Sequence, residues 1–592
     1  MALTPLSGTL GKKRAAHLLR RACFGATLTQ MDEFASLTAQ EAIGRLFMTN
    51  IPEPPLPVDP LTGQEWVVSG TTDANSEGFE LEQYFLRWHI GQMLSAGISN
   101  EQSLGYAFRE RLVVFMHTHF TTKKSVVNSS RALYFQNALF RFYAFDKEDR
   151  LVPGDPELVI PDRILVKSFK GLTKKICLDN AMLVFLDGRL NVKGSPNENY
   201  ARELMELYSI GRGLEGTLPE AEFQGDYINY TEEDVQQAAR VLSGFNTDDS
   251  FLTVDVDTNL PRGVIKGGGG SHDNGIKTFS ARMGGATIQP DITLQPNGQP
   301  NEESMIDEVD QLIEMIYAQP ETARNIARKI YRFFIYHEIN AGIQSGVIQD
   351  IADVFTANDF KLQPTLETLF TSREFYEAAD GVDDDSFGGI IKSPLDMVVG
   401  FMRSFGVQAP DYATDLEGFY SFTGSLLGSV DVQGMDYYEP FEVAGYSAYH
   451  QFPLFNRAWI TTNYLTNRYN FIRQHLTMET PMELGEVNAL EFVQTYIPNA
   501  TAANARALVI ALAGYFLPMS ENLTFDANAT NEITVERLNF FMNAFLFSPQ
   551  IDPDPEASWT FRWQNGVDTE VISNQLTNLL NAMLQSPEYQ LM

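Results

Sequence analysis

Charged and amide side chains between residues 187 and 211 have the spacing of a chemical site on a helix. Asn199, Glu203 and Glu206 are four and three residues apart, so a helix would place their side chains on one face. Two carboxylates one turn apart could bind a cation or transfer a proton. They could equally belong to a solvated face of ion pairs, which is common on helix surfaces. The residue types leave both interpretations open.

The neighbouring residues predict where this helix begins and ends. Ser195 and Pro196 fit the cap and the first position of a helix, and Gly211 fits its stop. Glu198 and Arg202 stand four residues apart, a spacing that suits an ion pair beside the polar face.

Two histidines, His117 and His119, are close enough in the sequence to suggest a shared ligand. On a strand both side chains would point to one side and could bind one metal ion. On a helix they diverge, unless the helix ends there. Glu110 precedes His117 by seven residues and would share its helical face. The pattern is compatible with a metal site and with a packed, hydrogen-bonded pair.

A third polar block, His272 with Asp273, follows a run of four glycines, so we expect it in a loop. Loops place polar side chains at clefts more readily than buried helices do. The pair could act as a general acid or base or supply a metal ligand, with Lys277 as a charge partner. The alternative is a turn in which Asp273 and Asn274 bond to the backbone before Gly275.

Composition restricts the class of protein. The 592 residues are 44% hydrophobic and 12% aromatic, values typical of a folded globular chain. The 76 acidic residues exceed the 43 basic ones and give a formal charge of −33, which argues against nucleic acid as a partner. Cys23 and Cys177 lack metal-ligand spacing, so they form one disulfide or, as we favour, two buried thiols.

No long apolar run predicts a membrane span. The basic residues near the start are not followed by an apolar core, so we expect no Sec signal peptide and, by default, a cytoplasmic protein.

Hydrophobic periodicity predicts a mainly α, large multi-helix globular protein with long loops and at most a few short strands. Helices are expected near residues 11–25, 38–47, 101–120, 131–144, 176–186, 231–244, 343–357, 394–405, 460–476, 502–516, 533–547 and 569–585. The segment 101–120 is apolar on several sides and is expected to be buried. We divide the chain into a helical part over 1–245, a Gly-, Asp- and Asn-rich loop region over 246–302 and a helical part over 303–592, which together form one continuous unit.

Several blocks of the sequence resemble the bacterial domain-of-unknown-function family 1800. They are A-A-H-L-L-R-R-A-C-F-G, R-E-R-L-V-V-F-M-H-T-H-F-T-T, N-E-N-Y-A-R-E-L-M-E-L, Y-T-E-E-D-V-Q-Q-A-A-R-V-L-S-G-F and H-D-N-G-I-K-T-F, with K-S-P-L-D-M-V-V-G and S-P-E-Y-Q later in the chain. The resemblance implies a large, mostly helical bacterial protein whose relatives often carry export signals. It also implies a possible protein partner of alkaline-phosphatase-like type, encoded beside many members. Members commonly have His where this chain has Tyr208 and Trp where it has Phe245.

Together the polar blocks predict one site that binds a divalent metal ion and hydrolyses its substrate with a metal-bound water. In this hypothesis the metal ligands are His117, His119, Glu203 and Glu206, the catalytic residues are His272, Asp273 and Glu203, and the substrate-binding residues are Asn199, Arg202 and Lys277.

Two other functions fit the same sequence. In a non-catalytic helical scaffold or accessory subunit, the same residues would form a buried network of ion pairs. A carbohydrate or peptide binder would instead expose the aromatic rings between Tyr446 and Trp459 along a groove.

Overall fold

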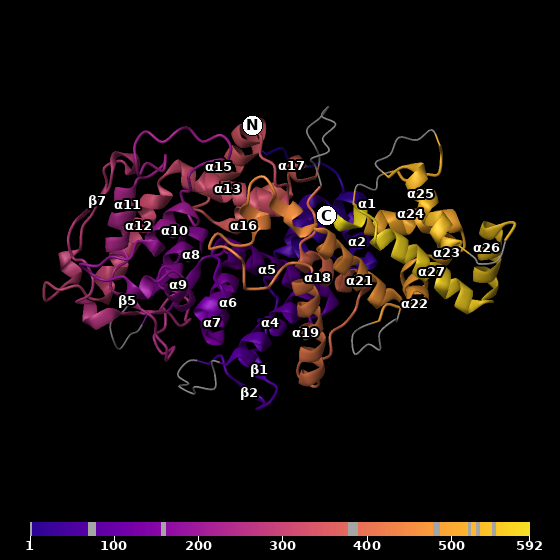
Figure 1. Ribbon diagram of the computed structural model, residues 1–592, viewed down its shortest axis with the longest axis horizontal. Helices are drawn as coiled ribbons and strands as arrows, with labels where there is room; N and C mark the ends of the chain where they lie inside the picture. The colour runs from indigo at the N-terminus through magenta and orange to yellow at the C-terminus, as the bar shows by residue number, and fades with distance from the viewer. Residues whose placement is uncertain are drawn as a thin grey trace.

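The computed structural model describes residues 3–68, 78–154, 162–376, 389–477, 486–518, 522–527, 533–547 and 552–592. Helices dominate these residues, as the periodicity predicts (Figure 1). The α-helices that precede the loop region 246–302 are α1 (Gly11–Cys23), α2 (Leu28–Ala35), α3 (Ala39–Leu46), α4 (Phe79–Met93), α5 (Asn100–His119), α6 (Lys124–Val127), α7 (Ser130–Ala144), α8 (Phe169–Ile176), α9 (Asn180–Phe185), α10 (Asn199–Glu206) and α11 (Glu232–Val241).

The remaining α-helices follow a loop region and continue to the end of the chain. They are α12 (Glu302–Tyr317), α13 (Pro320–Phe334), α14 (Ala341–Ile343), α15 (Gln349–Ala357), α16 (Leu362–Phe370), α17 (Arg373–Tyr376), α18 (Pro394–Phe405), α19 (Leu416–Val432), α20 (Ser447–His450), α21 (Thr462–Thr477), α22 (Ala489–Tyr496), α23 (Asn499–Ala502), α24 (Ala505–Phe516), α25 (Val535–Phe545), α26 (Pro555–Asn565) and α27 (Thr569–Leu584).

Strands occur only as short antiparallel pairs within the described residues, so no sheet forms the core there. The pairs are β1 (Val58–Asp59) with β2 (Gln64–Glu65), β3 (Arg150–Val152) with β4 (Arg163–Leu165), β5 (Phe245–Asn246) with β6 (Val264–Ile265) and β7 (Lys277–Thr278) with β8 (Thr287–Ile288). In the β3–β4 hairpin Leu151 stands opposite Ile164. These strand pairs lie within loops between helices. Their small size agrees with the expected few short strands.

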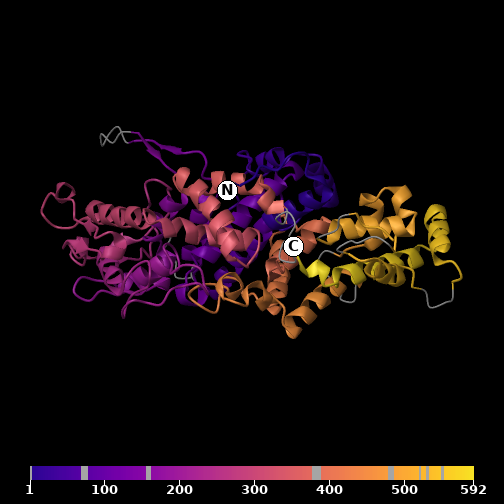
Figure 2. The ribbon, with the colours of Figure 1, turned by 90° about the horizontal axis from the view of Figure 1, so that it is seen from above.

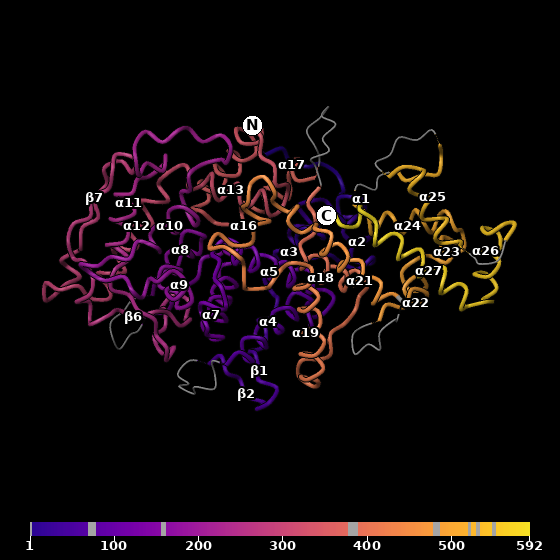
Figure 3. The backbone as a smooth tube through the Cα atoms, in the orientation of Figure 1, coloured from indigo at the N-terminus to yellow at the C-terminus, as the bar shows by residue number. Residues whose placement is uncertain are grey.

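The molecule is elongated in both ribbon views (Figures 1 and 2). The loop region between α11 and α12 lies at one end and helices α22–α27 at the other, and the tube in Figure 3 shows α5 between them. Both ends of the chain pack on its middle. Leu6 N donates to Thr371 O (2.8 Å) and Met592 N donates to Ile390 O (2.9 Å).

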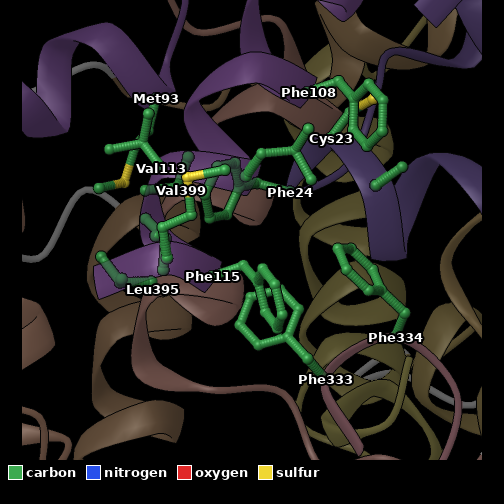
Figure 4. Packing of buried hydrophobic residues seen from close by; sticks show 14 of the residues in the cluster. Cys23, Phe24, Met93, Phe108, Val113, Phe115, Phe333, Phe334, Leu395 and Val399 are labelled. Atoms are coloured by element: carbon green, nitrogen blue, oxygen red, sulfur yellow. The ribbon is translucent and has the colours of Figure 1, made fainter. Parts of the chain in front are cut away.

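Helix α5 runs through the core. Its side chains are buried almost without interruption from Ser103 to His119, as its apolar character on several sides predicts. Phe115 packs against Phe333 and Phe334 of α13, with ring centroids 5.1 and 5.8 Å apart. Figure 4 shows these rings in one cluster with side chains of α1, α4 and α18, so one hydrophobic core joins segments from both halves of the chain.

Helix α10 begins later than the sequence predicts. It starts at Asn199, whereas Ser195 lies in an isolated bridge with Val192, so the predicted cap at Ser195 and Pro196 is wrong. The cause is local hydrogen bonding by asparagine, because Asn197 Oδ1 accepts from Asn199 N at 3.0 Å and holds a turn before the helix. The predicted stop is also wrong, because α10 ends at Glu206 with Leu207 as its cap. Gly211, with φ +67°, instead closes the turn that follows, where its N–H donates to Met205 O at 2.8 Å.

The helix predicted near 176–186 begins later than expected. Helix α8 ends at Ile176 and α9 begins at Asn180, with Asp179 as its cap accepting from Met182 N at 2.8 Å. Both cysteines are buried and free, as expected. In the part of the chain that the structure describes, no helix is long and apolar enough to cross a bilayer.

Close contact between α4 and α19 depends on a glycine. A Cβ atom built on Gly91 would lie 2.1 Å from Phe419 Cζ, a contact that is sterically impossible without movement. Phe419 is fully buried, so its ring cannot move into solvent. By contrast, a Cβ atom on Gly428, also within α19, meets no atom within 4 Å.

We therefore expect opposite effects from two glycine substitutions. Gly91→Ala should lower the free energy of unfolding by about 1–3 kcal/mol through overpacking. Gly428→Ala should raise it by about 0.5–1 kcal/mol, because alanine favours the helix. Chemical denaturation of both variants measures this. A Gly91→Ala variant as stable as the wild type would show that α4 and α19 do not pack as described.

Candidate functional site

Helix α10 presents its polar residues in three different environments. Arg202 Nη2 donates to Glu232 (2.6 Å) on α11 and to Glu198 (3.1 Å). Glu206 accepts from Arg212 at 2.9 Å. Asn199 Nδ2 donates to Leu186 O at 3.3 Å and so ties α10 to the end of α9. The predicted Glu198–Arg202 pair is present, and Arg202, expected to orient a substrate, is already engaged by two carboxylates.

Glu203 differs from its neighbours on α10. Its half-buried carboxyl group makes no hydrogen bond and no ion pair with any residue in the described ranges. Burial, and then the nearby Glu206, raise the pKa of Glu203 to about 7, against the effects of Arg202 and Arg212. A carboxyl group with a pKa near neutrality can both accept and donate a proton at physiological pH.

His117 and His119 lie on a continuous helix, so their side chains diverge. The His117 ring stacks on Tyr438 with 3.9 Å between centroids, and neither ring nitrogen has a hydrogen-bond partner among the described residues. Burial lowers its pKa to about 3. His119 Nε2 donates to Tyr208 O at 2.9 Å, near the end of α10. The two histidines therefore face different parts of the protein.

The carboxylate expected on the face of His117 belongs to a separate network. Glu110 is fully buried and accepts two hydrogen bonds from Arg141, at 2.8 and 2.6 Å, while His89 Nε2 lies 3.3 Å away. Burial alone would raise the pKa of Glu110, but the Arg141 charge and hydrogen bond hold it well below its ordinary value. The sequence spacing predicts the helix face on which Glu110 lies, but it does not predict the contact with Arg141 of α7.

The block around His272 forms a closed network of its own. His272 Nδ1 contacts Ser243 O at 2.8 Å and Nε2 contacts Glu308 of α12 at 3.2 Å. Lys277 Nζ also bonds to Glu308, and the side chains of all three residues are fully buried. Burial lowers the pKa of Lys277, while Glu308 opposes this shift.

Asp273 both fixes its own loop and binds an arginine. It accepts from Arg240 Nε at 2.8 Å and from Gly275 N at 2.9 Å. The hydrogen bond from Arg240 lowers the pKa of Asp273 to about 2. The turn at Asp273 that the sequence offered as an alternative is therefore present. The hydrogen bond from Arg240 to Asp273 anchors the long loop on α11, and the contacts of His272 and Lys277 with Glu308 anchor it on α12.

The predicted metal ligands do not come together as one group. Across the described ranges, no set of three or more His, Cys, Asp or Glu side chains is arranged to hold a metal ion. The divalent metal and the catalytic roles of His272, Asp273 and Glu203 stay predictions. Of the rings expected to line a groove, Tyr446 and Trp459 are buried, at 5% and 4% exposed, whereas Phe452 is 56% exposed.

A cavity of about 630 Å³ lies away from these blocks, and sequence analysis did not single out its residues. It is bounded by α7, α8, α12, the base of the β3–β4 hairpin and the loop 255–262. Its wall includes the buried Tyr143, whose hydroxyl lacks a hydrogen-bond partner among the described residues, and Asp179. Burial raises the pKa of Asp179 to about 7. Only long-range packing assembles this cavity, so no local spacing could reveal it.

The family described as proteins of unknown function, DUF1800, matches residues 17–591, nearly the whole chain. The chain belongs to the DUF1800 family. No curated protein and no solved structure matches it. In this DUF1800 protein the polar residues of the signature blocks lie in separate environments, and Glu203 and both ring nitrogens of His117 have no partner among the described residues.

The network around Glu308 gives a testable expectation. Glu308→Gln should lower the free energy of unfolding by about 3–5 kcal/mol, because it leaves Lys277 buried without its counter-charge. Glu556→Gln removes the exposed ion pair with Arg506 and should cost less than about 1 kcal/mol. Denaturation of both variants measures the difference. Equal effects would mean that the buried network does not anchor the loop.

Proposed function

We propose that this protein binds a small, uncharged amphipathic molecule in the cavity between α8 and α12. The observation that carries the proposal is the Tyr143 hydroxyl, which is buried at the cavity without a hydrogen-bond partner among the described residues. An unsatisfied buried hydroxyl costs about 1–3 kcal/mol. A ligand with an acceptor oxygen at this point would remove that cost.

The size and the walls of the cavity suit such a ligand. Its volume of about 630 Å³ is within the range of small-molecule sites. One part of the wall is apolar and comprises Leu139, Leu178, Leu260, Ile306 and Val309. An apolar ligand body would gain roughly 25 cal/mol for each Å² that it buries there.

The charges at the cavity favour an uncharged ligand. Lys175 pairs with Asp255 at 2.7 Å and Arg262 pairs with Glu302 at 2.9 Å. Lys174 pairs with Glu314 at 3.0 Å. A charged ligand group would have to compete with these partners, whereas a neutral acceptor needs only the free hydroxyl of Tyr143.

Binding of the neutral, apolar dye Nile red tests the proposal. We expect saturable fluorescence enhancement with the wild type and a reduction of affinity of at least tenfold for Ile306→Trp, which fills the cavity. Val126→Trp places the same ring on α6, away from the cavity, and should bind like the wild type. Equal affinity of all three proteins would exclude the cavity as the binding site.

The unpaired hydroxyl also predicts an effect on stability without ligand. Tyr143→Phe should raise the free energy of unfolding by about 1 kcal/mol, because it removes an unsatisfied polar group. Tyr317→Phe should lower it by a similar amount, since the Tyr317 hydroxyl shares a 2.6 Å hydrogen bond with Thr173. Denaturation curves of the two variants are the measurement. Destabilisation by Tyr143→Phe would mean that its hydroxyl is satisfied.

A second candidate function is proton transfer by Glu203 in a hydrolytic reaction. It is favoured by the unpaired carboxyl group with a pKa of about 7 on a family signature helix. His272 and Asp273 are weaker candidates for proton transfer, because His272 already contacts Glu308 and Asp273 already accepts from Arg240.

The raised pKa of Glu203 predicts a pH-dependent effect of its removal. Between the ordinary value of 4.5 and about 7, the folded chain keeps a proton that the unfolded chain releases, so stability falls as pH rises through this window. Glu203→Gln should therefore stabilise the protein at pH 8 by about 1–2 kcal/mol, after allowance for solvent screening, and have little effect near pH 4.

Denaturation at the two pH values measures this effect. Glu233→Gln, on α11, controls for the change in net charge. No gain at pH 8 would mean that Glu203 is ionised at neutral pH, which removes the basis for proton transfer.

A further inference from the structure

A group of buried cations lies where α1, α5, α18 and α21 meet. Five cationic side chains are each at most 9% exposed; they are Arg20, Arg21, Arg111, Lys392 and Arg468. Among the described residues their one ion pair is between Arg111 and Asp396, at 2.6 Å. Five buried cations thus share one carboxylate, although the whole chain has a formal charge of −33.

Main-chain oxygens accept hydrogen bonds from the arginines. Arg21 donates to Phe334 O at 2.8 Å and to Met592 O at 2.6 Å. Arg468 donates to Lys392 O at 2.8 Å. Carbonyl oxygens accept these hydrogen bonds but bring no net negative charge, and Arg21 Nε and Arg468 Nε have no partner among the described residues. The excess of positive charge therefore remains.

Lys392 is the member of the group that lacks such partners. It is 6% exposed, and its Nζ makes no hydrogen bond and no ion pair with any described residue. Nζ lies 3.4 Å from the centroid of the Tyr589 ring. A cation–π contact of this kind offsets only part of the cost of burying an ammonium group.

The same lysine borders a small cavity. The cavity has a volume of about 20 Å³, and its wall includes Lys392, Arg20, Asp396, Tyr589 and Tyr515. Such a volume accommodates one water molecule or one monatomic ion. The carboxylate in the wall is already used, because Asp396 accepts from Arg111 and from Ser393 N and Oγ.

We propose that this cavity is a binding site for one small monatomic anion of the chloride class, held between Lys392 Nζ and the guanidinium group of Arg20. The anion supplies the hydrogen-bond acceptor that Lys392 lacks and the negative charge that the five cations lack. The site is independent of the ligand cavity between α8 and α12.

Binding of the anion is linked to the protonation of Lys392. Without an anion, burial foremost and then Arg20 and Arg468 lower the pKa of Lys392 well below its ordinary value, while Asp396 opposes the shift. The ammonium form holds an anion better than the neutral amine, so anion affinity rises as pH falls. The titratable and charged groups that face Lys392 are Arg20 on α1, Asp396 on α18, Arg468 on α21, Tyr515 on α24 and Tyr589 near the end of the chain.

Thermal unfolding at constant ionic strength, with sodium gluconate replaced stepwise by sodium chloride, tests the proposal. The midpoint of the wild type should rise saturably, by about 2 °C when chloride exceeds its dissociation constant 100-fold. The rise should require less chloride at pH 6 than at pH 9. Lys392→Met should abolish it.

Lys329→Met is the matched control, because Lys329 donates to Leu207 O and does not border the cavity. It should keep the chloride-dependent rise. Bromide-soaked crystals of the wild type provide a second measurement that needs no variant, with an anomalous peak expected between Lys392 and Arg20. A midpoint that ignores chloride, an unchanged response of Lys392→Met or the absence of the bromide peak would overturn the proposal.

Discussion

The buried ion pair between Arg111 and Asp396 is the interaction on which the packing of the two halves depends. Arg111 lies on the central helix α5 and Asp396 in the first turn of α18, 285 residues later in the chain. The guanidinium group also stacks between the rings of Phe24 and Phe333, 4.9 and 4.6 Å from their centroids. One side chain therefore orients α1, α5, α13 and α18 at once. Because a charge in such a place must keep its partner, the relative position of these helices is tightly constrained.

Elsewhere several charged side chains are paired within small local networks. Glu110 is matched by Arg141, Glu308 by Lys277 and Asp273 by Arg240. In a low-dielectric interior, ion pairs of this kind fix the positions of loops and helices. Their side chains are already paired and have few hydrogen-bonding positions left for a ligand. Groups outside the networks are more informative about function. Glu203 and the Tyr143 hydroxyl each lack a partner among the described residues, and neither belongs to the three ion pairs named above. The charged residues that are paired therefore fix the fold, and these two groups are the ones on which the proposed functions rest.

The sequence predicts local secondary structure and burial well, but it does not predict which polar side chains contact one another in the fold. Hydrophobic period predicted the mainly α fold, and the apolar character of 101–120 predicted the burial of α5, because both depend on neighbouring residues. The start of α10 was missed because the turn made by Asn197 competes locally with the helix. The partners of His272 could not be predicted, since Glu308 lies 36 residues further on and within an apolar stripe. For the same reason the sequence marked His117 and Glu203 as polar residues of interest but could not show that they lie in different environments.

The position of the buried cations follows from what can compensate charge at short range. Surface carboxylates are screened within about 10 Å in salt, so an excess of acidic residues outside cannot neutralise cations inside. Arg21 is placed at the C-terminal end of α13, where Phe334 O offers both an acceptor and the negative end of the helix dipole. Arg111 has a carboxylate and two aromatic faces. Lys392 has a single aromatic face and the repulsion of two arginines. Since every other cation in the group meets an oxygen, Lys392 is the point at which the interior still lacks negative charge.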